Sequence, residues 1–160
     1  MGSKAYFSAN QLLQQEQKLI FTSLDNSDAL FIGEIAKSLG QSRELPIAIQ
    51  VRLLDWTVYH VSLPGSSSEN NQWLDRKARV VDLKHHSTLY ERISAEERGV
   101  NWHHENNLSK ATHAIHGGGF PLIAGNQKFL GALLISGLPQ VQDHLLAVEA
   151  LTNFFLARVS

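Results

Sequence analysis

Histidine is the residue type that could support the widest range of chemistry in this chain, which has eight histidines and no cysteine. Imidazole and carboxylate groups together suit zinc or iron. Such side chains gather within fourteen positions: His103, His104, Glu105, His113 and His116. Their spacing matches no metal motif, because HExxH would require a second histidine where Leu108 stands. A polar loop whose histidines face water is therefore the simpler interpretation of this cluster.

Two further groups could contact a ligand. The pair His86-Ser87 follows an expected helix, where an imidazole can cap the last carbonyls or, together with the hydroxyl, orient an anion. The sequence leaves both interpretations open. Lys77 follows Trp73 by one helical turn on an otherwise apolar stripe. Its ammonium either extends to the rim of the core or holds a carboxylate or phosphate in a pocket.

The run Gly117-Gly118-Gly119, between His116 and Phe120, is the most specific local feature. Glycine permits positive φ and close approach of backbone N–H groups to a neighbour. The GxxxxGK and GxGxxG motifs are both absent. Ser136 places a hydroxyl near the expected start of the last helix, where anions are stabilised. We expect the second and third glycines to have positive φ or close packing, so that valine at either position is destabilising.

Hydrophobic periodicity indicates the elements that must position these groups. Five strands are expected, near residues 19–21, 47–53, 56–62, 120–124 and 128–136. About four helices are expected, the clearest over 26–39, 70–84, 89–98 and 139–159, with a further short helix near 10–16. Residues 99–110 are polar without a clear period and are expected to form a loop. Two adjacent hairpins favour an antiparallel α+β domain.

Length and composition exclude several protein classes. A chain of 160 residues with 43% hydrophobic residues can bury a core, and we expect one domain over 1–160 with a flexible N-terminus over 1–7. The net charge of -1 gives no positive field for nucleic acid or an anionic membrane. No apolar run is long enough to span a membrane. The missing signal peptide and cysteines lead us to expect a cytoplasmic protein.

An ordered set of motifs resembles the haem-degrading-domain family, also called GlcG/HbpS-like, which includes the C-terminal part of PduO-type corrinoid adenosyltransferases. The set comprises Gly118-Gly119-Phe120-Pro121, Gly131, Ser136-Gly137 and Asp143. An uncharacterised branch of the family has a tryptophan and a lysine four apart, then His-Ser-Ser. Here Trp73, Lys77 and His86-Ser87-Thr88 match it, with threonine in place of the second serine. The resemblance covers residues 12–151.

The resemblance implies a profilin-like fold, with a five-stranded antiparallel sheet flanked by helices, that commonly assembles into homo-oligomers. Leu54 and Trp56, at the tip of the first hairpin, are candidate interface residues. The leading hypothesis is a small ligand-binding domain for haem, a corrinoid or another anionic molecule. The candidate ligand-binding residues are Trp73, Lys77, His86, Ser87, His116, Gly117, Gly118, Gly119, Phe120 and Ser136.

Haem would require an axial ligand and basic partners for its propionates. His86 and His116 are the candidate metal ligands, and Lys77 is the candidate basic partner. Two other classes of function stay open. One is an oligomeric interaction protein with no small-molecule chemistry. The other is an enzyme of unknown reaction, although the sequence shows no nucleophile motif, metal triad or carboxylate pair.

Overall fold

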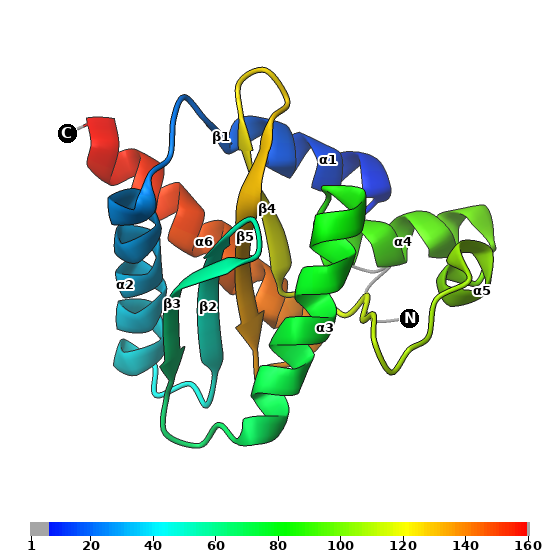
Figure 1. Ribbon diagram of the computed structural model, residues 1–160, viewed down its shortest axis with the longest axis horizontal. Helices are drawn as coiled ribbons and strands as arrows, with labels where there is room; N and C mark the ends of the chain where they lie inside the picture. Colours follow the sequence, from blue (N-terminus) through cyan, green and yellow to red (C-terminus); the bar gives the residue numbers. More distant parts are fainter. Residues whose placement is uncertain (1–6, 160) are drawn as a thin grey trace.

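The computed structural model describes residues 7–159, which form a five-stranded sheet with helices on both faces (Figure 1). The helices are α1 (Ala9–Lys18), α2 (Asn26–Ser42), α3 (Ser68–Lys84), α4 (Thr88–Arg98), α5 (Trp102–Asn106) and α6 (Gln140–Val159). The strands are β1 (Ile20–Phe21), β2 (Ala48–Leu53), β3 (Trp56–Ser62), β4 (Gly119–Ala124) and β5 (Phe129–Ser136). The expected α+β class, with a five-stranded sheet and flanking helices, is confirmed.

The strands lie in the order β1-β4-β5-β2-β3. The β2–β3, β2–β5 and β4–β5 pairings are antiparallel, as the two expected hairpins require. The β1–β4 pairing is parallel, with Ile20 opposite Ile123, so the prediction of a purely antiparallel sheet is wrong at this edge. The physical reason is the connection, because a long crossover through several helices allows the parallel direction that a tight hairpin does not.

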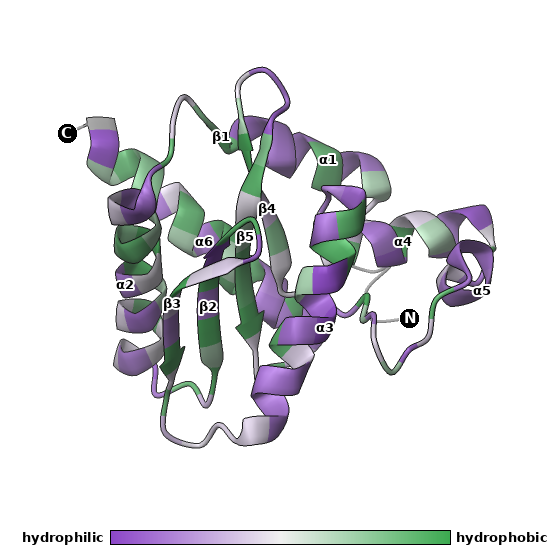
Figure 2. Ribbon diagram, viewed as in Figure 1, coloured by the Kyte–Doolittle hydropathy of each residue, from purple (hydrophilic) through white to green (hydrophobic). Residues whose placement is uncertain are grey.

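The two faces of the sheet are covered in different ways. On one face, α2 and α6 form the larger apolar core, which contains aromatic side chains such as Phe21, Phe120 and Phe154. On the other face, α3 places Ala78 close to Ala132 of β5, and these small side chains allow a close approach of helix to sheet. Figure 2 shows the apolar colouring concentrated on the central strands. Within residues 7–159, no helix is both long and apolar enough to cross a membrane.

The N-terminal helix α1 packs against α4. Ser8 caps α1 by accepting a hydrogen bond from the backbone N–H of Gln11, as its residue type predicts. Leu12 of α1 is buried with Leu89 of α4. The expected flexible segment over residues 1–7 lies outside the described residues, apart from Phe7, which packs at the margin of this contact.

The sequence predicts a loop over residues 99–110, but the structure places the short helix α5 there. The Asn101 side chain accepts a hydrogen bond from the N–H of His104 and so caps this helix. Trp102 is buried, and its indole N–H donates to Glu91 of α4 at 2.9 Å. One cap and one buried aromatic residue are enough for a helical turn that has no readable periodicity.

Gly118 and Gly119 meet the sequence expectation in different ways. Gly118 has φ +128°, and a Cβ atom there would overlap the carbonyl oxygen of Ile135. Gly119 lacks positive φ, but a Cβ atom there would lie 2.9 Å from side-chain carbons of both Thr88 and Val81. Both positions therefore exclude a side chain.

We expect Gly118→Ala to destabilise the fold by at least about 2 kcal/mol, because positive φ and a backbone clash act together. A loss of this size would lower the melting temperature by roughly 4–8 °C for a chain of this length. Thermal unfolding followed by circular dichroism measures the effect. Gly125→Ala is the matched control, since an added Cβ there meets open space. Equal melting of the two variants would contradict the interpretation.

Candidate functional site

A pocket of about 220 Å³ lies where α3, the end of β5 and the start of α6 meet. We call it the lysine pocket. It is lined by Asn70, Trp73, Lys77, His116, Ser136, Gly137, Leu138, Gln140 and Asp143. The fold thus brings together four of the candidate residues from the sequence, namely Trp73, Lys77, His116 and Ser136.

Lys77 and Asp143 form a buried ion pair at this pocket, with side chains 3% and 2% exposed. The Lys77 Nζ donates to the carbonyl oxygen of Ile135 at 2.9 Å and lies 3.4 Å from Asp143 Oδ2. The Asp143 carboxylate also accepts hydrogen bonds from the backbone N–H groups of Gly137 and Leu138. One cation therefore joins α3 to β5 and α6, and the alternative in which Lys77 extends to the rim of the core is wrong.

Burial favours the neutral form of both partners, so it lowers the pKa of Lys77 and raises the pKa of Asp143. Desolvation lowers the pKa of the Lys77 ammonium, and the attraction of Asp143 offsets only part of that effect. Desolvation also raises the pKa of Asp143 to about 6, against the opposing effects of Lys77 and the two backbone N–H groups. A proton at this pair is therefore held less firmly by the lysine, and more firmly by the carboxylate, than it would be in water.

A second pocket of about 250 Å³ adjoins the first, and we call it the basic pocket. Its cationic and imidazole side chains are Arg76, Arg92, Lys110, His103, His113 and His116. His116 lines both pockets. Its ring lies edge-on to Trp73 with centroids 4.8 Å apart, and the Arg76 guanidinium lies 4.3 Å from the centroid of the same indole.

The His116 imidazole is exposed at the boundary of the two pockets. Partial desolvation, followed by the positive charges of Arg92, Lys77 and Arg76, holds its pKa below the ordinary value of 6.5. His116 is consequently neutral at physiological pH. The neutral imidazole is the form that ligates a metal ion.

The polar segment after α5, which carries His113 and His116, is held by hydrogen bonds to α3 and α5. Arg76 donates to the carbonyl of Lys110, and Arg79 donates to the carbonyl of Thr112 at 3.0 Å. The His103 ring hydrogen-bonds the carbonyl of His113 at 2.7 Å. Among residues 7–159, no three histidine or carboxylate side chains gather as they would around a metal ion.

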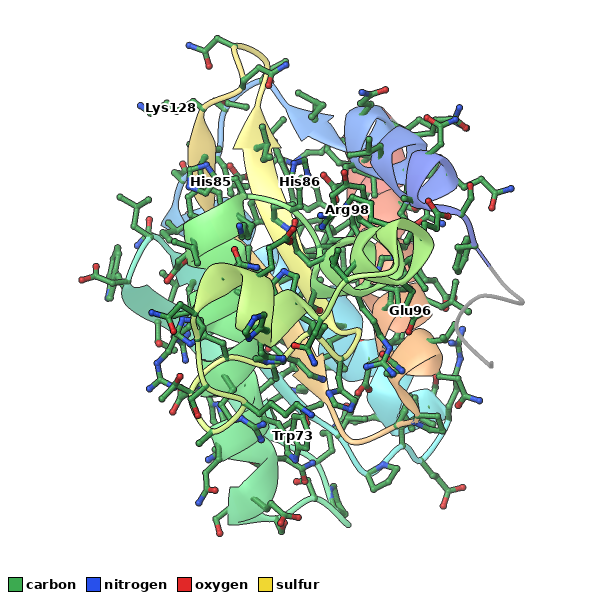
Figure 3. All side chains as sticks on the ribbon, turned by 90° about the vertical axis from the view of Figure 1, so that its right-hand side faces the viewer. Trp73, His85, His86, Glu96, Arg98 and Lys128 are labelled. Atoms are coloured by element: carbon green, nitrogen blue, oxygen red, sulfur yellow. The ribbon has the colours of Figure 1, made fainter. Side chains whose placement is uncertain are left out.

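His86 and Ser87 lie apart from the lysine pocket. Figure 3 shows His86 toward one end of α3 and Trp73 toward the other. His86 Nδ1 lies 2.8 Å from Glu16 Oε1, and the Ser87 N–H donates to Glu16 Oε2 at 2.9 Å. The Ser87 hydroxyl accepts from the N–H of Tyr90 and caps α4. These residues join α1 to the α3–α4 turn.

The hydrogen bond that His86 donates to the Glu16 carboxylate raises the pKa of His86 above its ordinary value of 6.5, although desolvation opposes it. This pair therefore adds stability fully below about pH 6.5 and loses it as pH rises through the raised pKa of His86. Glu16 was not among the candidate residues. Its signal in the sequence is a carboxylate four residues after Leu12, on the apolar face of α1.

The glycine run and Phe120 occupy supporting positions. The Gly117 N–H donates to the Gln140 side chain at 3.2 Å, and a Cβ on Gly118 would lie 2.8 Å from Lys77 Nζ. The Gly119 N–H donates to the Thr88 hydroxyl at 3.0 Å. Phe120 is 1% exposed and lies in the core beneath α2 and α6. Gly117 and Gly118 therefore lie next to residues that line the lysine pocket, but neither the glycines nor Phe120 line it.

Known proteins are similar to this chain over the region that contains both pockets. A family model described as "Haem degrading protein HbpS-like" matches residues 24–152. A UPF0303 protein of Streptomyces coelicolor is 35% identical over 144 residues, which cover 90% of this chain and 91% of the relative. All residues that line the lysine pocket fall within the matched region.

Solved structures share the fold. The crystal structure of the Ybr137w protein has a TM-score of 0.86 and 24% sequence identity, covering 96% of this chain and 90% of that chain. The crystal structure of a PduOC:heme complex has a TM-score of 0.68 and 18% identity, covering 81% of this chain and 94% of that chain. At these identities the likeness concerns the fold.

We expect Ser87→Ala to lower the free energy of unfolding by about 1 kcal/mol, because α4 loses its N-terminal cap. Denaturant unfolding at constant pH measures the change. Ser23→Ala, in the exposed loop before α2, is the control and should be close to neutral. If Ser87→Ala is as stable as the wild type, the Ser87 hydroxyl is not needed as a cap, and its role would be to contact a ligand.

Proposed function

The chain belongs to the HbpS-like family of haem-degrading proteins, and from that premise we propose that it is a small-molecule-binding domain. The proposed ligand is haem or a related anionic tetrapyrrole, bound across the boundary of the lysine pocket and the basic pocket. The observation that carries the proposal is the position of His116, which lines both pockets with a neutral, exposed imidazole. His86, the other candidate axial ligand, is instead engaged by Glu16.

The sizes of the pockets support a ligand that spans them. Small-molecule sites usually enclose about 300–1,000 Å³. The pockets of about 220 and 250 Å³ are each smaller than this, and together they fall within that range. A flat macrocycle across the boundary would present its iron to His116, with the Trp73 indole beside it.

The charges of the basic pocket support an anionic ligand. Arg76, Arg92 and Lys110 line it, and Glu96 is its acidic side chain. Arg92 forms an ion pair with Glu96, and neither its buried Nε nor that of Arg76 makes a hydrogen bond among the described residues. A guanidinium with an unused donor suits a carboxylate such as a haem propionate. The PduOC:heme structure further supports haem as the first ligand to test.

We expect haem to bind with a saturable shift of its Soret absorbance. His116→Ala should weaken this binding at least about tenfold, equivalent to about 1.4 kcal/mol. His86→Ala should bind haem like the wild type, because His86 belongs to the contact with Glu16. His104→Ala is the control for loss of an exposed imidazole. An unchanged spectrum at stoichiometric haem, or full binding by His116→Ala, would contradict the proposal.

We also propose that the protein forms a homo-oligomer. Leu30 and Phe31 of α2 and Leu156 of α6 are 43%, 42% and 60% exposed. Phe31 lines a groove of about 490 Å³ between α2 and α6, the two helices that cover the sheet on the face opposite α3. Contiguous apolar side chains on a surface mark sites of association.

We expect light scattering at micromolar concentration to give a mass of at least twice the 17.8 kDa of one chain. Phe31→Glu combined with Leu156→Glu should shift the protein toward the monomer, because it places one charge in the groove and another on the exposed surface of α6. Leu83→Glu, on exposed α3, is the matched control. A wild-type monomer would contradict assembly, and dissociation by the control alone would assign the interface to α3.

A further inference from the structure

We propose that the lysine pocket has an activity separate from tetrapyrrole binding: Lys77 forms an imine with a small polar aldehyde or ketone, and Asp143 transfers the proton. The inference does not rest on the proposed function. It rests on a buried amine that lines a pocket, beside a buried carboxyl group in the same pocket.

The surroundings of Lys77 Nζ leave room for a reaction. Its two hydrogen-bond partners are the carbonyl of Ile135 and the carboxylate of Asp143. Two of the three positions around the nitrogen are thus used, and the third can carry the lone pair of a neutral amine. Lys77 itself lines the pocket, so the space open to a substrate is the pocket of about 220 Å³.

The electrostatic environment favours the neutral, nucleophilic form of the Lys77 amine more than water does. The charged or titratable groups around Lys77 are Asp143, Arg76 and His116. Burial, followed at a distance by Arg76, lowers the pKa of Lys77, and Asp143 opposes this shift. Desolvated lysines with lowered pKa values are the usual imine-forming residues. A neighbouring carboxyl group with a pKa of about 6 can both give and accept a proton.

The reaction balances without an oxidant or a reductant. The lone pair of Nζ attacks the carbonyl carbon, the carbon–oxygen π bond breaks, and the carbonyl oxygen takes the proton of the Asp143 carboxyl group. The Asp143 carboxylate then removes a proton from nitrogen. The carbinolamine hydroxyl takes that proton back from the Asp143 carboxyl group and leaves as water while the nitrogen lone pair forms the C=N bond, and the proton on the iminium nitrogen returns to the Asp143 carboxylate. An amine and a carbonyl compound therefore give an imine and one water.

The remaining wall of the pocket indicates the class of substrate. Asn70, Ser136 and Gln140 line it with amide and hydroxyl groups, and the Asn70 amide lies 3.4 Å from the Ser136 hydroxyl. Such groups hydrogen-bond a polar substituent next to the reacting carbonyl. The volume of about 220 Å³ limits the substrate to a small molecule. A short hydroxy- or carboxy-substituted aldehyde or ketone fits these requirements.

The test is competition among lysines of the intact wild-type chain. The protein is incubated with glyoxylate and sodium cyanoborohydride at pH 6.5, and the reduced adducts are mapped by peptide mass spectrometry. We expect Lys77 to be modified at least about tenfold faster than the exposed Lys18 and Lys128, because burial favours the neutral, nucleophilic form of the Lys77 amine.

A matched variant assigns the adduct. Lys77→Arg keeps a cation and hydrogen-bond donors but forms no stable imine, so the adduct should disappear while the other lysines react as before. Haem binding has a separate spectroscopic readout, so failure of either experiment leaves the other interpretable. The proposal is overturned if natively folded wild-type protein carries adducts on Lys18 and Lys128 but not on Lys77. The Lys77–Asp143 pair would then serve only to join α3, β5 and α6.

Discussion

The buried contact of Lys77 with Asp143 and the Ile135 carbonyl constrains the rest of this structure, because it is where three elements must meet in register. Transfer of two charges from water into a protein costs several kcal/mol per ion, and their attraction recovers that cost only with good geometry. Here the backbone N–H groups of Gly137 and Leu138 complete the geometry around the carboxylate. A buried pair of this kind adds little net stability, yet loss of one partner leaves the other charge uncompensated.

Both pockets follow from this arrangement. The lysine holds α3 against the ends of β5 and α6, and the turn of α3 that carries Trp73 and Arg76 then faces His116. The arginines of α3 bond carbonyls of the segment that precedes His116, which fixes the imidazole between an amine-lined and a guanidinium-lined cavity. The contact of Lys77 with Ile135 and Asp143 also requires glycine at position 118, because any side chain there would collide with the lysine nitrogen.

Periodicity predicted the parts of the fold that are regular over several residues. The alternation of residues 47–53 and the apolar run 128–136 correspond to β2 and β5. The parallel pairing of β1 escaped prediction because two residues have no period and their partner lies about a hundred positions later. The grouping of Trp73, Lys77, His116 and Ser136 came from the family resemblance and from polar residues on apolar elements. The sequence around His86 could not show that this residue lies apart from the lysine pocket, because its partner Glu16 is 70 residues away.

The family match begins at residue 24, so it leaves out two N-terminal elements on which the rest of the fold depends. The strand β1 and the helix α1 precede that point, yet β1 covers the free edge of β4 and α1 covers Leu89 and Ile93. A fragment that begins at residue 24 would leave the edge of β4 unpaired and would expose Leu89 and Ile93 of α4. Strand edges of this kind recruit other chains, so the shortened fragment would be a candidate for aggregation rather than a minimal domain.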